Sequence, residues 1–190
     1  MIKKILCSLF VLLLFAMPAA AMDDFVETSE WIAANRNTWI FGPFEAENLN
    51  GDGPVTEAIF ADAELTFINF WATWCPPCVA EIPALAQVDE ESGGNVRVIG
   101  VLMDGIGPRG DRDERAIAAM RTLLDRSNAE FPVLFPADAI VLEAMSVVHA
   151  VPTTFVVNRE GVLVDGHVGA MTQVDQWLDY AQKLLDEADA

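Results

Sequence analysis

Stretches of apolar residues with the composition of β-strands alternate with stretches of helical periodicity along most of this chain. Residues 65–70 and 96–103 are almost wholly apolar and rich in β-branched and aromatic side chains, which predicts two strands covered on both faces. Apolar residues then recur every three or four positions over 76–92 and 111–127, which predicts a helix after each strand. Strands that alternate with helices indicate the α/β class.

The second half of the chain continues this alternation with shorter elements. We expect a strand near 131–134, a helix over 138–148, and two strands at 154–158 and 162–168 joined by a tight turn. A final helix begins near Thr172, where a Thr-x-x-Asp pattern is typical of a helix N-terminus. The alternation followed by a hairpin predicts a mixed central β-sheet flanked by helices.

The segment before the first buried strand predicts an N-terminal β-hairpin extension. Residues 50–54 read Asn-Gly-Asp-Gly-Pro, a concentration of turn-forming residues that places a hairpin before Val55. Residues 22–43 hold aromatic side chains scattered among polar ones, and we expect a short helix and an extended lead-in whose aromatics pack on the domain. The predicted domain itself covers residues 44–190.

The first 21 residues have the pattern of a secretory signal peptide. Lys3 and Lys4 precede an apolar run over 5–17, and three alanines follow it, so cleavage is expected after Ala21. This pattern predicts export to the periplasm or another extracytoplasmic compartment. A retained membrane anchor is the alternative, although the apolar run is shorter than the roughly 20 residues of a spanning helix.

Charge and cysteine content narrow the possible functions. The formal net charge is −18, which argues against nucleic acid as a partner. Of three cysteines, Cys7 leaves with the signal peptide, so the mature chain keeps Cys75 and Cys78. Two cysteines so close in sequence stabilise little as a cross-link, because the loop they close is short. Their spacing therefore favours a functional pair.

The pair has the arrangement that thiol-disulfide exchange requires, which is an attacking thiolate and a nearby resolving thiol. If a helix begins at Cys75, its sulfur lies at the positive end of the helix dipole, which favours the thiolate. Cys78 lies one turn further and is shielded, so we assign it the resolving role. Pro76 and Pro77 are compatible with a first helical turn and remove N–H donors that could reach the sulfur.

Two segments resemble a known family. Residues 70–78 read Phe-Trp-Ala-Thr-Trp-Cys-Pro-Pro-Cys and are followed by Glu81 and Pro83, which resembles the active site of the thioredoxin superfamily in its exported TlpA/ResA-like branch. Residues 151–155, Val-Pro-Thr-Thr-Phe, resemble the cis-proline loop of that family. The resemblance covers about residues 44–185 and implies a thioredoxin-like fold.

The resemblance also implies a substrate-binding surface around the cysteines. Pro152 should be cis and lie against Cys75, and the backbone of Val151 should offer hydrogen bonds to an incoming peptide. Trp74 and Pro76 should belong to the surface that meets the substrate.

One departure from cytosolic thioredoxins concerns the proton acceptor. Those proteins usually carry a buried Asp where this chain has Asn69, which cannot take a proton. Glu81 lies three residues beyond Cys78, and its position matches a Glu of the exported branch. We therefore expect Glu81 to exchange the Cys78 proton and, if buried, to resist ionisation. A surface Glu is the alternative.

Other cysteine chemistries fit less well. A c-type haem motif needs His after the second Cys, where Val79 stands, and His149 and His167 are too far apart for a zinc site of two Cys and two His. In peroxiredoxins, which share the broad fold, a Thr or Ser usually stands at the position of Ala72.

The sequence thus predicts an extracytoplasmic protein disulfide reductase of the TlpA/ResA type. It would work as a monomer without a bound cofactor, receive electrons from a membrane thiol donor, and reduce oxidised exported proteins, including cytochrome c apoproteins. A thiol oxidase or disulfide isomerase is the first alternative, since exchange is reversible. A copper-binding module and a peptide-binding module with an inert disulfide are the others.

Overall fold

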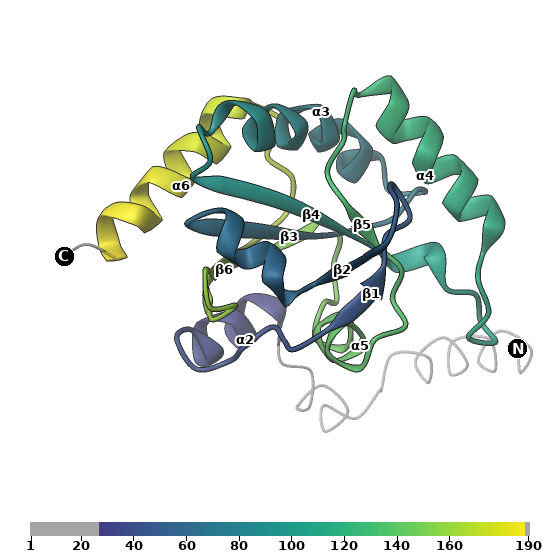
Figure 1. The fold of residues 1–190 in the computed structure, drawn as a ribbon, viewed down its shortest axis with the longest axis horizontal. Coiled ribbons are helices and arrows are strands. Elements are labelled where there is room, and N and C mark those ends of the chain that lie inside the picture. The colour runs from purple at the N-terminus through teal and green to yellow at the C-terminus, as the bar shows by residue number, and fades with distance from the viewer. Residues whose placement is uncertain (1–26, 189–190) are drawn as a thin grey trace, which may run out of the picture.

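The computed structural model describes residues 27–188, and the predicted signal peptide with Cys7 lies outside them. A five-stranded sheet of order β5-β4-β3-β6-β7 forms the centre, and a two-stranded sheet of β1 and β2 lies beside it (Figure 1). In chain order the elements are α2 (Thr28–Asn35), β1 (Glu45–Glu47), β2 (Pro54–Thr56), the 3-10 helix η2 (Glu57–Asp62), β3 (Leu65–Trp71), α3 (Pro76–Glu91), β4 (Val96–Leu102), the 3-10 helix η3 (Met103–Gly105), α4 (Glu114–Arg126), β5 (Val133–Leu134), α5 (Ala139–Ser146), β6 (Thr153–Asn158), β7 (Leu163–Val168) and α6 (Val174–Ala188).

The sheet is mixed, as the sequence predicts. β3 lies in the middle and pairs in parallel with β4 on one side and antiparallel with β6 on the other. Every residue of β3 is buried, which explains why this strand shows no polar-apolar alternation. The antiparallel β6 and β7 form the predicted terminal hairpin.

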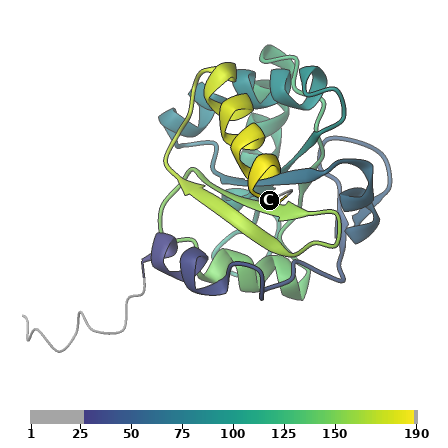
Figure 2. The same cartoon turned by 90° about the vertical axis from the view of Figure 1, so that its left-hand side faces the viewer.

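Helices cover both faces of the sheet. α3, α4 and α6 lie on one face and α2 and α5 on the other, and Figure 2 shows the sheet between α6 and α2 (Figures 1 and 2). Each face has its own apolar core: Ile82, Ile117 and Trp177 belong to the first, and Ile32 and Val141 to the second. No helix within residues 27–188 is long and apolar enough to cross a membrane.

The N-terminal segment packs on the domain. β1 and β2 form the predicted hairpin, and α2 is the predicted short helix. Trp31 stacks on Phe155 of β6 with ring centroids 5.5 Å apart and meets Trp39 edge to face at 5.3 Å. Phe41 is fully buried in the same core. The aromatics of the lead-in are therefore core residues.

Several elements differ by a few residues from the predicted bounds; β5 (Val133–Leu134) and α5 (Ala139–Ser146) are shorter than predicted, and α6 begins at Val174 rather than near Thr172. α4 begins at Glu114 rather than Asp111, because the Asp113 side chain accepts hydrogen bonds from the N–H groups of Arg115 and Ala116 and so caps the helix. β4 ends at Leu102, because the chain turns there into η3.

Candidate active site

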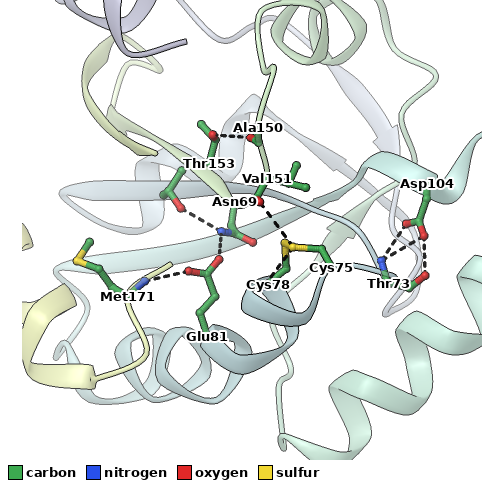
Figure 3. The surroundings of a disulfide bond; sticks show 11 residues. Asn69, Thr73, Cys75, Cys78, Glu81, Asp104, Ala150, Val151, Thr153 and Met171 are labelled. Carbon is green, nitrogen blue, oxygen red and sulfur yellow. Dashed lines mark hydrogen bonds between the residues drawn. A yellow bond between two sulfur atoms is a disulfide. The ribbon is translucent and has the colours of Figure 1, made fainter. Parts of the chain in front are cut away.

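The two cysteines lie where β3 passes into α3. The N–H of Cys75 donates to the carbonyl of Ala72 at 3.1 Å, and Cys75 is the N-cap residue of α3. Cys75 and Cys78 are joined in a disulfide, with the sulfurs 2.05 Å apart (Figure 3). Cys78 is fully buried, whereas Cys75 keeps 3% of its surface exposed. The structure thus places the pair as the sequence predicts.

The backbone at the helix start points one donor at the outer sulfur. Pro76 and Pro77 have no N–H, and the N–H of Cys78 donates to Cys75 Sγ at 3.3 Å. This donor and the positive end of the α3 dipole both favour negative charge on Cys75 over Cys78. The geometry therefore suits Cys75 as the attacking sulfur.

The second predicted segment meets the first across the site. The Val151–Pro152 peptide bond is cis, and the carbonyl oxygen of Val151 lies 3.6 Å from Cys75 Sγ. A second cis bond, Gly42–Pro43, has no counterpart in the sequence prediction. Trp74 is 70% exposed and Pro76 is exposed beside it. An exposed apolar surface therefore adjoins the sulfur that lies next to Val151.

Asp104, in η3, is a site residue that sequence reasoning missed. Its carboxylate accepts hydrogen bonds from the Thr73 N–H at 3.1 and 3.2 Å and from the Thr73 hydroxyl at 2.5 Å. These contacts fix the loop between β3 and Cys75 from the end of the neighbouring strand. The sequence signal that could have identified Asp104 is an acidic residue directly after a predicted central strand.

Glu81 is fully buried behind the disulfide rather than exposed on the surface. Its carboxylate accepts from Asn69 Nδ2 at 2.8 Å and from the Met171 N–H at 3.3 Å (Figure 3). Burial raises the pKa of Glu81 from its ordinary 4.5 to about 7, although both hydrogen bonds act in the opposite direction. The expected resistance to ionisation is confirmed, and Glu81 can exchange a proton near neutral pH.

Replacing Glu81 should change how stability depends on pH. The raised pKa means that the folded state holds this proton more tightly, so Glu81 costs little stability below about pH 4.5 and more as pH rises through about 7. Glu81→Gln avoids this cost. In the oxidised protein, the free energy of unfolding of Glu81→Gln relative to wild type should rise by up to about 3 kcal/mol from pH 5 to pH 9.

Urea unfolding at the two pH values measures this difference. Glu91→Gln, at an exposed position on the same helix, is the matched control and should show no such trend. A relative stability of Glu81→Gln that is flat across this range would contradict the placement of Glu81.

His149 follows α5 and His167 lies on β7. Among residues 27–188, no three His, Cys, Asp or Glu side chains are grouped so that they could hold a metal ion. His167 lies on β7 against Trp177 and Tyr180, and burial lowers its pKa.

Comparisons with known proteins agree with this geometry. Residues 37–165 match the family model described as the AhpC/TSA family. The chain is 32% identical to the thioredoxin-like protein YneN of Bacillus subtilis over 72% of this chain and 75% of that protein. It is 29% identical to the thiol-disulfide oxidoreductase ResA of Halalkalibacterium halodurans over 68% of this chain and 67% of that protein.

A solved structure supports the fold. The exposed lipoprotein thioredoxin of Streptococcus pneumoniae strain TIGR4 superposes with a TM-score of 0.58 and is 25% identical, over 75% of this chain and 99% of that one.

Proposed function

This chain belongs to the AhpC/TSA family and is a thiol-disulfide oxidoreductase, and we propose that it works as an extracytoplasmic protein disulfide reductase. One observation carries the proposal. Cys75 and Cys78 form a disulfide at the start of α3, where the Cys78 N–H donates to Cys75 Sγ. The pair would supply an attacking and a resolving sulfur, and thiol-disulfide exchange by such a pair needs no bound cofactor.

In the reduced protein, the Cys75 thiolate attacks one sulfur of a substrate disulfide. A bond forms between Cys75 Sγ and that sulfur, and the other substrate sulfur leaves as a thiolate. Cys78 then loses its proton and attacks Cys75 Sγ, which releases the second substrate thiolate and closes the Cys75–Cys78 disulfide. Two electrons pass to the substrate, and Glu81, buried beside this pair, is the proposed proton acceptor.

The substrate would dock on the surface around Cys75. The exposed Trp74 and Pro76 offer apolar contact, and Val151 lies with its carbonyl oxygen beside Cys75 Sγ. Backbone groups near the reacting sulfur hold an extended peptide by strand-like hydrogen bonds. We therefore assign Trp74, Pro76, Val151 and Pro152 to substrate binding.

The signal-peptide pattern of residues 1–21 supports export, with cleavage after Ala21 or retention as an anchor. In that compartment a monomer would take electrons from a membrane thiol donor and pass them to oxidised exported proteins, cytochrome c apoproteins among them. The acidic surface makes nucleic acid an unsuitable partner.

The reduction potential of the cysteine pair decides between reductase and oxidase. We expect equilibration of the purified protein with dithiothreitol or glutathione buffers to give a potential near the roughly −270 mV of thioredoxin. A value near −120 mV, typical of strong exported oxidants, would instead establish the oxidase alternative. A reduced protein that binds copper but exchanges no disulfide would support the binding-module alternative.

A further inference from the structure

Asn69 is a buried residue of β3 that contacts the carboxylate of Glu81. It is 2% exposed on β3, and its register partner on β6 is Thr154. Both hydrogens of its amide are used, because Nδ2 donates to Glu81 Oε1 at 2.8 Å and to Thr154 Oγ1 at 3.0 Å. Figure 3 shows the carbonyl oxygen of Asn69 on the side of the amide that faces the disulfide.

This arrangement suits only the ionised form of Glu81. Its partners, Asn69 Nδ2 and the Met171 N–H, are both donors. A protonated carboxyl must itself donate one hydrogen bond, and a backbone N–H cannot accept it. Since the pKa of Glu81 is about 7, both forms are populated near neutral pH. A buried O–H without an acceptor is destabilising, so the surroundings must adapt.

The Asn69 amide can adapt without moving the backbone. A half-turn of Asn69 brings its carbonyl oxygen to face Glu81 and Thr154, where it accepts from the carboxyl O–H and from the rotated threonine hydroxyl. The threonine hydroxyl serves either orientation, because it can accept or donate. The half-turn also directs the Asn69 NH2 group to the sulfur side.

We propose that Asn69 is a positioning residue whose amide reverses with the protonation of Glu81 and thereby sets the acidity of the Cys78 thiol. This rests on the proposed exchange function. With Glu81 ionised, the Asn69 carbonyl oxygen is on the side of the cysteine pair and favours the Cys78 thiol. With Glu81 protonated, the NH2 group is on that side and favours the thiolate.

The proton balance follows from these two states. Cys78 gives up its proton as it becomes the attacking thiolate, and Glu81 takes that proton up, as proposed above. Asn69 changes orientation but neither gains nor loses a proton. The titratable groups that the packed elements bring near this site include Cys78 of α3, His167 of β7, opposite Thr154, and Tyr180 of α6; Asp165 of β7 acts on both His167 and Tyr180. Burial lowers the pKa of His167 and raises that of Tyr180, so burial favours the neutral form of both side chains.

A double-mutant cycle tests the coupling. In a Cys75→Ser background, thiolate absorbance reports the titration of Cys78 alone. Glu81→Gln should raise the acid dissociation constant of Cys78 about tenfold, because the amide is no longer held with its carbonyl toward the sulfur. In Asn69→Ala the same Glu81 change should alter the constant less than about twofold. An equal change in both backgrounds would overturn the proposal, because Glu81 would then act on Cys78 without Asn69.

Thr66→Val provides the matched control, since Thr66 is buried on β3 with its side chain on the opposite face from Asn69. It should leave the Cys78 titration unchanged. If Asn69→Ala does not fold, side-chain amide NMR of the oxidised wild-type protein tests whether the Asn69 amide responds to the protonation of Glu81. The Asn69 NH2 signals should shift with the midpoint of the Glu81 carboxyl and stay constant in Glu81→Gln. Signals that stay constant while Glu81 titrates would refute the switch.

Disulfide exchange by the wild-type chain is measured in parallel. If the wild-type chain shows no exchange activity, the proposed function is refuted. If the chain is active but the effects of Asn69→Ala and Glu81→Gln are additive, only the proposed role of Asn69 is refuted.

Discussion

Cys75→Ser should abolish the reduction of insulin disulfides by this protein in the presence of dithiothreitol. Cys75 holds the helix N-cap position, its sulfur accepts a hydrogen bond from the Cys78 N–H, and it is the residue of the pair with exposed surface. A serine hydroxyl is not ionised at neutral pH and cannot form the mixed disulfide, so the first step of exchange is lost. The measurement is the initial rate of insulin reduction above the dithiothreitol background. Activity equal to wild type would exclude Cys75 as the nucleophile.

Cys78→Ser is the matched change at the other sulfur. It should leave the attack intact but remove the resolving step, so a mixed disulfide between Cys75 and the substrate accumulates. Mass spectrometry of the alkylated complex identifies the linked cysteine. A wild-type rate of turnover in Cys78→Ser would show that an external thiol, rather than Cys78, resolves the intermediate.

Trp177→Ala should give the largest loss of stability among the changes considered. Trp177 of α6 is fully buried, packs on Phe67 with ring centroids 5.3 Å apart, and donates from Nε1 to the Met171 carbonyl at 2.8 Å. Its truncation leaves a large cavity and an unpaired carbonyl, which should lower the free energy of unfolding by about 4 kcal/mol. Urea unfolding of the oxidised protein, with fluorescence and circular dichroism compared, measures the loss.

Trp74→Ala removes the same side chain from an exposed position and is the control for Trp177→Ala. Trp74 is 70% exposed, so the free energy of unfolding should change by less than about 0.5 kcal/mol. If Trp74 contacts the substrate as proposed, KM for a protein disulfide should rise while the rate with a small disulfide stays close to wild type. Equal destabilisation by the two changes would contradict the burial that separates them.

Local sequence signals predicted most of the fold because they report on short-range constraints. Apolar runs over 65–70 and 96–103 correspond to β3 and β4, since a strand covered on both faces cannot carry a polar pattern. Element bounds were less well predicted. The start of α4 depends on which of several acidic residues caps the helix, and spacing alone does not distinguish Asp111 from Asp113.

The sequence by itself identified the two cysteines and predicted which of them lies at the start of the helix. Cys75 and Cys78 are three residues apart, and a helix that begins between them fixes which sulfur meets the free N–H groups. The signal-peptide pattern and the acidic composition are also read without a structure. These features depend on spacing along the chain or on composition.

Only the tertiary structure decided what surrounds the sulfurs. Asp104 lies 31 residues from Thr73, and Met171 lies 90 from Glu81; of the long-range contacts, the family resemblance implied only that of the Val151–Pro152 loop with Cys75. No local pattern encodes such contacts, because the order of strands in the sheet creates them. The raised pKa of Glu81 has the same origin, since packing of β3, α3 and the segment before α6 removes water from a carboxyl that helical spacing alone could leave on the surface.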